Sequence, residues 1–154
     1  DVTDRVFAAF KRHYAKNCMV LTRPYPGIPE MLDALKARGW KLGVVSNKAD
    51  EPVKALIAHY FPGVFDSVVG ERENVRKKPA PDSVFETVGS LGCDIGQAVY
   101  IGDSDVDGQT AANAGCDCIL VAWGFRGRET LLPFGCPIAD STDELLNILT
   151  EGEK

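Results

Sequence analysis

Acidic side chains gather in one stretch of the sequence, residues 99–108, where an apolar run ends at Gly102. Asp103 and Asp107 follow this run with three residues between them, and Asp105 lies between the two. Open α/β sheets bind ligands at the carboxyl ends of their strands, where the chain leaves the apolar core. Carboxylates crowded at such a place repel one another, and a hard divalent cation such as Mg²⁺ prefers oxygen ligands. The stretch therefore indicates either a metal site or an acidic turn with Asp107 as a helix N-cap.

Two further polar groups fall where apolar segments give way to loops. Ser46 and Asn47 follow the apolar residues 40–45, and Lys78 precedes a helical segment. A hydroxyl and an amide can donate hydrogen bonds to phosphoryl oxygens, and an ammonium can neutralise their charge. Taken alone, Ser-Asn is typical of a turn, and a lysine before proline is typical of a solvated surface. Because these groups occur in order at the ends of successive strands, we interpret them together as a site for a phosphate held beside a metal.

The elements that must position these residues alternate between helices and strands from Ile28 onward. Helical spacing of apolar residues predicts helices over residues 2–14, 28–35, 52–60, 83–91, 109–114 and 142–149. Short apolar runs predict strands over residues 40–45, 65–69, 97–101, 116–121 and 137–139. The alternation predicts an α/β fold, a doubly wound parallel sheet with helices on both faces.

Composition restricts the class of protein further. The length of 154 residues suits one domain, and the formal net charge of -5 argues against a nucleic-acid partner. No apolar run is long enough to span a bilayer and no signal-peptide pattern is present, so we expect no membrane partner. The five cysteines include no CxxC pair, and Cys116 and Cys118 alternate along a predicted strand and so share one face. We expect a reduced, cytoplasmic protein without a zinc site.

Three motifs resemble those of a known family. Residues 44–47 (Val-Val-Ser-Asn), 78–82 (Lys-Pro-Ala-Pro-Asp) and 102–107 (Gly-Asp-Ser-Asp-Val-Asp) are similar to motifs two, three and four of the haloacid dehalogenase superfamily. The match is nearest to the phosphoglycolate phosphatase-like branch. Residues 23–27 (Arg-Pro-Tyr-Pro-Gly) resemble the connector by which that branch re-enters its core from a helical cap. The resemblance covers nearly the whole chain from that connector onward.

The resemblance implies a role for each site residue. Ser46 matches the phosphate-binding residue of motif two, with Asn47 beside it, and both are expected at the substrate phosphate. Lys78 matches the lysine that stabilises the nucleophile and the phosphoryl charge. Asp103 matches the direct Mg²⁺ ligand, and Asp107 matches the second acid, which supports the metal shell or the lysine. Asp105 falls between these positions and carries less weight.

One motif of the family is absent from the sequence. The first motif is an apolar strand ending in Asp-x-Asp, which supplies the nucleophile and the general acid/base, whereas Asp1 and Asp4 precede a predicted helix instead. The chain therefore resembles the C-terminal part of a phosphatase, with residues 1–21 as a remnant of the helical cap and 22–154 as an incomplete core. The missing strand would lie between the strands that bear motifs two and four. We expect these two strands to pair directly, another chain to fill the gap by self-association, or the chain to fold poorly.

The function implied for the complete protein is a Mg²⁺-dependent phosphatase. It would hydrolyse a small, phosphoglycolate-like phosphate monoester through an aspartyl-phosphate. The alternatives are a phosphomutase of the same superfamily and a non-catalytic phosphate- or metal-binding domain. A receiver-like regulatory domain fits less well because its acid pair would follow the first strand. Since the nucleophile is absent, we expect the chain alone to be inactive.

Overall fold

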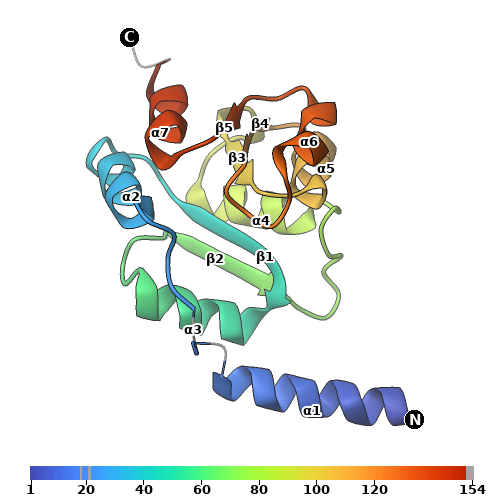
Figure 1. Cartoon of the computed structure of the whole chain (residues 1–154). Helices are drawn as coiled ribbons and strands as arrows, with labels where there is room; N and C mark the ends of the chain where they lie inside the picture. The colour runs from blue at the N-terminus through green and yellow to red at the C-terminus, as the bar shows by residue number, and fades with distance from the viewer. Residues whose placement is uncertain (18, 21, 152–154) are drawn as a thin grey trace.

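The strands of the chain form two parallel sheets, as the computed structural model shows over residues 1–17, 19–20 and 22–151 (Figure 1). One sheet pairs β1 with β2 and the other has the order β3-β4-β5. The strands are β1 (Gly43–Ala49), β2 (Ser67–Glu71), β3 (Val99–Gly102), β4 (Asp117–Val121) and β5 (Ile138–Ala139). The predicted α/β class with parallel strands is confirmed.

Helices connect successive strands, as parallel pairing requires. The α-helices are α1 (Val2–Asn17), α2 (Ile28–Ala37), α3 (Asp50–Tyr60), α4 (Asp82–Leu91), α5 (Asp105–Ala114), α6 (Arg128–Leu131) and α7 (Thr142–Thr150). Two short 3₁₀ helices, η1 (Ile95–Gln97) and η2 (Leu132–Phe134), precede β3 and β5. Among the described residues, no helix combines the length and hydropathy needed to cross a bilayer.

Apolar side chains form two cores on opposite faces of the β3–β4 sheet. One core joins α2 and α7 to the sheet through Leu35, Leu145 and Ile119. The other joins α4 and α5 to β3, and Cys118 packs against it. Because alternate residues of a strand point to opposite faces, Ile119 and Cys118 place these cores on the two sides of β4. Helices thus cover both faces, as the sequence predicts.

A gap separates the two sheets between β1 and β3 (Figure 1). Within the described residues these strands are not hydrogen-bonded to each other, so the direct pairing that is one of the three expected outcomes is not observed. A cavity of about 520 Å³ is lined by side chains and backbone of both strands, including Val44, Val45, Tyr100 and Ile101. The position of the gap is the one expected for the missing strand.

The first strand differs from its prediction. β1 begins at Gly43 and runs to Ala49, whereas the apolar run predicts residues 40–45. Its pairing with β2 shifts register between Val45 and Ala49. Ser46 and Asn47 therefore lie in the irregular part of the strand rather than after its end, because the chain stays extended until it pairs again with β2.

The helix after the acidic stretch also begins earlier than predicted. α5 begins at Asp105 rather than at residue 109, and Ser104 is its N-cap, since the Ser104 hydroxyl accepts a hydrogen bond from the Asp107 amide at 3.3 Å. The alternative that Asp107 is the N-cap is therefore wrong. Asp105 and Asp107 lie in the first turn, where the helix dipole favours negative charge.

The first helix lies at the edge of the molecule, where it contacts β1 through Tyr14 (Figure 1). The side chains of Val2, Val6, Phe7 and Phe10 on α1 are exposed. Tyr14 on this helix accepts a hydrogen bond from the ammonium of Lys48. The division into a cap remnant over 1–21 and a core over 22–154 stays a prediction, and Cys18 lies outside the described residues.

Candidate functional site

Lys78 and Asp107 form an ion pair with little solvent exposure. The Lys78 ammonium lies 2.7 Å from Oδ1 of Asp107 and donates to the Tyr100 hydroxyl at 3.0 Å. The same hydroxyl donates to Asp107 Oδ1 at 3.1 Å. The side chains of Lys78 and Asp107 are 13% and 8% exposed. Three hydrogen-bonding groups thus satisfy one another at the carboxyl end of β3.

The charge of Asp107 is stabilised despite its burial. Burial alone would raise the pKa of this carboxyl, but hydrogen bonds from Lys78 and Ser104 outweigh it and hold the pKa below its ordinary value. The Ser104 hydroxyl donates to Oδ2 at 2.5 Å. Burial, with the nearby negative charge of Asp107, raises the pKa of the Tyr100 phenol. Asp107 is therefore ionised and Tyr100 is a neutral donor at neutral pH.

Asn47 holds the main chain of Lys78. The Asn47 side-chain amide donates to the Lys78 carbonyl at 3.1 Å and accepts from the Lys78 N–H at 2.8 Å. Asn113 of α5 donates to the carbonyl of Pro79 at 2.8 Å. These contacts fix the loop before α4 between β1 and α5. In the structure Asn47 therefore positions the main chain of Lys78, whereas the sequence predicts that Asn47 binds the phosphate.

Asp103 is held through both its side chain and its main chain. Its carboxylate oxygen Oδ2 accepts from the Phe125 N–H at 3.0 Å, and its own N–H donates to Oδ2 of Asp107 at 3.2 Å. Gly102 has no room for a side chain, because a Cβ there would lie 2.2 Å from the Cβ of Asp107. The two acids are consequently packed into one rigid turn.

The cavity between the sheets brings part of the predicted site together. Lys78, Asp103 and Asp107 all line it. Ser46 and Asn47 do not line it, although Val45 before them does. The Ser46 hydroxyl accepts a hydrogen bond from the Lys48 N–H at 3.1 Å. Asn47 is thus linked to the site through Lys78, and Ser46 only by its position beside Val45.

The donor chemistry at Asp103 fits a hard cation. Among the described residues, nothing hydrogen-bonds to Oδ1 of Asp103, which is a carboxylate oxygen of the kind that Mg²⁺ prefers. Both oxygens of Asp107 are occupied, by Lys78, Tyr100 and Ser104. No cluster of three or more His, Cys, Asp or Glu side chains suited to a metal occurs in the described part of the chain. Asp103 is therefore the residue that would hold Mg²⁺, and Asp107 supports the lysine.

Sequence reasoning missed two members of this network. From the sequence, Tyr100 is predicted as part of the apolar strand, although a phenol in the strand that leads to two acids indicates a polar partner. Ser104 is passed over between the acids, although serine just before a helix is a strong N-cap signal. No sequence signal points to the amide of Phe125, because any residue carries an N–H.

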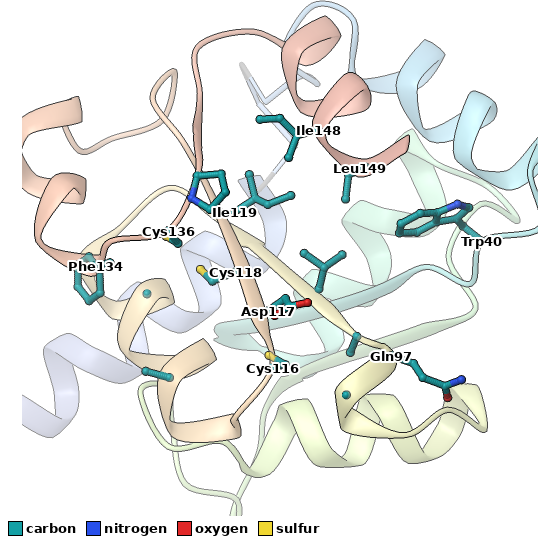
Figure 2. Close-up of a pocket in the computed structure, with 16 residues that line it drawn as sticks. Trp40, Gln97, Cys116, Asp117, Cys118, Ile119, Phe134, Cys136, Ile148 and Leu149 are labelled. Atoms are coloured by element: carbon teal, nitrogen blue, oxygen red, sulfur yellow. The ribbon is translucent and has the colours of Figure 1, made fainter. Parts of the chain in front are cut away.

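A second cavity, of about 650 Å³, lies near the opposite ends of β3 and β4 (Figure 2). Trp40, Phe134 and three half-buried cysteines line it, namely Cys116, Cys118 and Cys136. None of the five predicted site residues lines this cavity. Cys116 and Cys118 also pack against the same core of α4, α5 and β3, as expected of two residues on one face of a strand. The five predicted site residues therefore lie outside this second cavity.

The chain thus combines a parallel α/β fold with a buried acid–lysine pair and a carboxylate oxygen that has no hydrogen-bond partner among the described residues. Residues 2–121 match the family model described as haloacid dehalogenase-like hydrolase. The chain belongs to this family.

Similar proteins carry one recurring name. A phosphoglycolate phosphatase of Aquifex aeolicus is 39% identical over 125 residues, which are 80% of this chain and 59% of the relative. Another, from Rhodospirillum rubrum, is 35% identical over 136 residues, which are 86% of this chain and 55% of the relative. The crystal structure of a candidate phosphoglycolate phosphatase from Lactobacillus delbrueckii subsp. bulgaricus superposes with a TM-score of 0.90 at 44% identity, covering 95% of this chain and 62% of that one. The chain thus spans about three fifths of the length of these relatives.

Proposed function

We propose that the chain forms the phosphate- and metal-binding part of a Mg²⁺-dependent phosphatase, a phosphoric monoester hydrolase whose substrate is small and phosphoglycolate-like. The observation that supports this most is the network of Lys78, Asp107 and Tyr100, which shares one cavity with Asp103. The names of the relatives agree with this substrate class.

Lys78 is suited to neutralise phosphoryl charge. An ammonium has three N–H donors, and Asp107 and Tyr100 accept two of them. The third donor is left for a phosphoryl oxygen. Because the ammonium is already held in place, it needs no reorganisation when charge develops on the phosphoryl group.

Ser46 and Asn47 have different roles in binding the phosphate. The Ser46 oxygen accepts from the Lys48 amide, which leaves its own O–H free to donate to a phosphoryl oxygen. Asn47 acts through the main chain of Lys78 and keeps the lysine at the cavity.

Asp103 would hold Mg²⁺ through its free carboxylate oxygen, with water completing the shell. When bound, the ion would draw charge from the phosphoryl oxygens and orient the ester. Asp107 contributes by fixing Lys78 and by accepting the main-chain N–H of Asp103.

The nucleophile of the proposed reaction is an aspartate outside these 154 residues. Its carboxylate would displace the alcohol from phosphorus, and water would then hydrolyse the aspartyl-phosphate. The gap between β1 and β3 supports this, because it is lined by apolar residues and reaches Lys78 and Asp103. The substrate's alcohol is then recognised by residues outside the chain. We further propose a reducing, cytoplasmic setting, because the five cysteines of the sequence include no CxxC pair.

The test uses this chain joined to an upstream segment that ends in Asp-x-Asp. Phosphate release from phosphoglycolate is measured with and without MgCl₂ in Asp103→Asn, Asp107→Asn and a control variant. We expect Asp103→Asn to abolish Mg²⁺-dependent turnover and Asp107→Asn to reduce it less. Asp117→Asn is the control, because Asp117 is exposed at the amino end of β4.

Full activity in Asp103→Asn would overturn the proposed function. Release of free phosphate also separates a phosphatase from a phosphomutase, which would instead move the phosphoryl group to a second position of its substrate.

A further inference from the structure

The loop after β4 contacts the acidic stretch at two points. We call residues 122–127 the Gly124 loop. The main-chain N–H of Phe125 donates to Oδ2 of Asp103 at 3.0 Å. The guanidinium of Arg126 lies 3.3 Å from Oδ1 of Asp105. The loop therefore lies against the turn that carries the proposed metal ligand.

Gly124 is required by space rather than by backbone conformation. A Cβ at this position would lie 2.0 Å from Oδ2 and 2.2 Å from the Cβ of Asp103. Gly124 is not among the glycines with positive φ, so its backbone alone does not call for glycine. The missing side chain is what lets the Phe125 amide reach the carboxylate.

The two carboxylate oxygens of Asp103 differ in their hydrogen bonding. Oδ2 is held by the Phe125 amide, while Oδ1 has no hydrogen-bond partner among the described residues. The Asp103 N–H is fixed in turn by Asp107. The carboxylate and the main chain of Asp103 are thus both held by hydrogen bonds, and one carboxylate oxygen is left for a ligand.

The geometry points to a positioning role for the Gly124 loop: its main chain orients the Asp103 carboxylate for Mg²⁺. This inference rests on the proposed function. A neutral amide holds the carboxylate without competing for it as a cation would. Groups that orient a metal ligand in this way are typically worth about 10- to 100-fold in metal affinity.

The role belongs to the main chain of the loop rather than to its side chains. The Phe125 side chain is 95% exposed, so its ring does not hold the loop in place. The side chains of the Arg126–Asp105 pair are 56% and 38% exposed. Exposed pairs of this kind contribute little.

The experiment is a titration of the ¹⁵N-labelled chain with MgCl₂, followed through the backbone amide signals of residues 102–108 and 125. Gly124→Ala pushes a methyl group into the space of Asp103, and we expect it to raise the Mg²⁺ dissociation constant at least tenfold. Gly127→Ala is the matched control in the same loop, because nothing lies within 4 Å of a Cβ there. Phe125→Ala keeps the amide. Both controls are expected to bind as the unaltered chain does.

A second measurement covers the case in which Gly124→Ala does not fold. In the unaltered chain without metal, the Phe125 amide should exchange slowly with solvent, and Asp103→Ala should remove that protection. Rapid exchange of this amide in the unaltered chain, or equal Mg²⁺ affinity in a folded Gly124→Ala, would overturn the positioning role. Failure of the unaltered chain to bind Mg²⁺ at all would instead count against the proposed function.

Discussion

The ammonium of Lys78 lies 2.7 Å from Oδ1 of Asp107, a residue 29 positions further along the chain. Taking both charges out of water is costly, and the pair alone need not stabilise the fold. Tyr100 and Ser104 satisfy the remaining hydrogen-bonding capacity of the carboxylate. We therefore interpret the pair as a means of fixing the Lys78 ammonium at the cavity. Removal of one partner would destabilise the fold, because the other charge would stay buried without its counterion.

Lys78→Ala is expected to lower the free energy of unfolding by about 2–4 kcal/mol, because it leaves the Asp107 charge buried without its cation. Lys77→Ala is the matched control. The Lys77 ammonium lies 2.8 Å from Glu71 in an exposed pair, and its loss should cost about 0.5 kcal/mol or less. Urea denaturation of both variants measures the difference. In the complete enzyme, Lys78→Ala should also lower the phosphatase rate strongly while Lys77→Ala does not. Equal losses in the two variants would contradict the assignment.

The environment of Asp50, which lies outside the candidate site, predicts that the stability of the fold depends on pH. Its carboxylate accepts from Lys54 at 2.6 Å and from the Gly70 N–H at 2.8 Å, with the side chain 13% exposed. The hydrogen bond from Lys54 is the main reason that the pKa of Asp50 is lowered; burial opposes this and Gly70 adds to it. Because the folded pKa lies below the unfolded value, the stabilisation is present above about pH 4 and is lost as pH falls through the folded pKa.

Asp50→Asn therefore should destabilise the chain by about 1–2 kcal/mol at pH 7 and by much less near pH 2. Urea denaturation at the two pH values tests this. A difference between the chain and the variant that is the same at both would show that the charge of Asp50 contributes nothing.

The order of the elements and the clustering of three candidate site residues could be predicted because their signals are local. An apolar run followed by Asp103 marks the end of β3, and a lysine before Pro-Ala-Pro marks the loop before α4. Such patterns need only neighbours in sequence. Lys78, Asp103 and Asp107 accordingly lie along one cavity, as their positions at strand ends imply.

What the sequence could not show depends on partners far along the chain. Asn47 holds the main chain of Lys78, 31 residues away, and a side-chain amide gives no sign of which backbone group it will bind. The hydrogen bond from the Phe125 N–H to Asp103 likewise could not be predicted from the sequence. The extension of β1 beyond residue 45 follows from renewed pairing with β2 at Ala49, which is a property of the neighbouring strand.

Cys118 should react slowly with alkylating agents in the folded chain. Burial, with Cys136 close by, raises the pKa of the Cys118 thiol to about 12. A smaller fraction of this thiol is therefore ionised at pH 8 than of an unfolded cysteine, whose pKa is about 8.5. Iodoacetamide should consequently modify Cys118 more slowly in the folded chain than in the chain unfolded in guanidinium chloride. Peptide mass spectrometry reads the rate at this cysteine, and similar rates in the two states would show that the thiol is not protected.

The chain by itself should not turn over phosphate esters. Asp107 is occupied by Lys78, Tyr100 and Ser104, and Asp103 is needed for the metal, so neither is available as a nucleophile. Among the residues that the structure describes, no strand lies between the facing edges of β1 and β3, and unpaired backbone groups beside an apolar cavity are costly. Another strand, from a second copy or from an upstream segment, would relieve that cost.

The purified chain is mixed with MgCl₂ and an aryl phosphate, and release of the phenol is followed. We expect no release above the background, although weak binding of Mg²⁺ or phosphate can persist. Steady turnover that disappears in Asp103→Asn would mean that a nucleophile is present among these 154 residues.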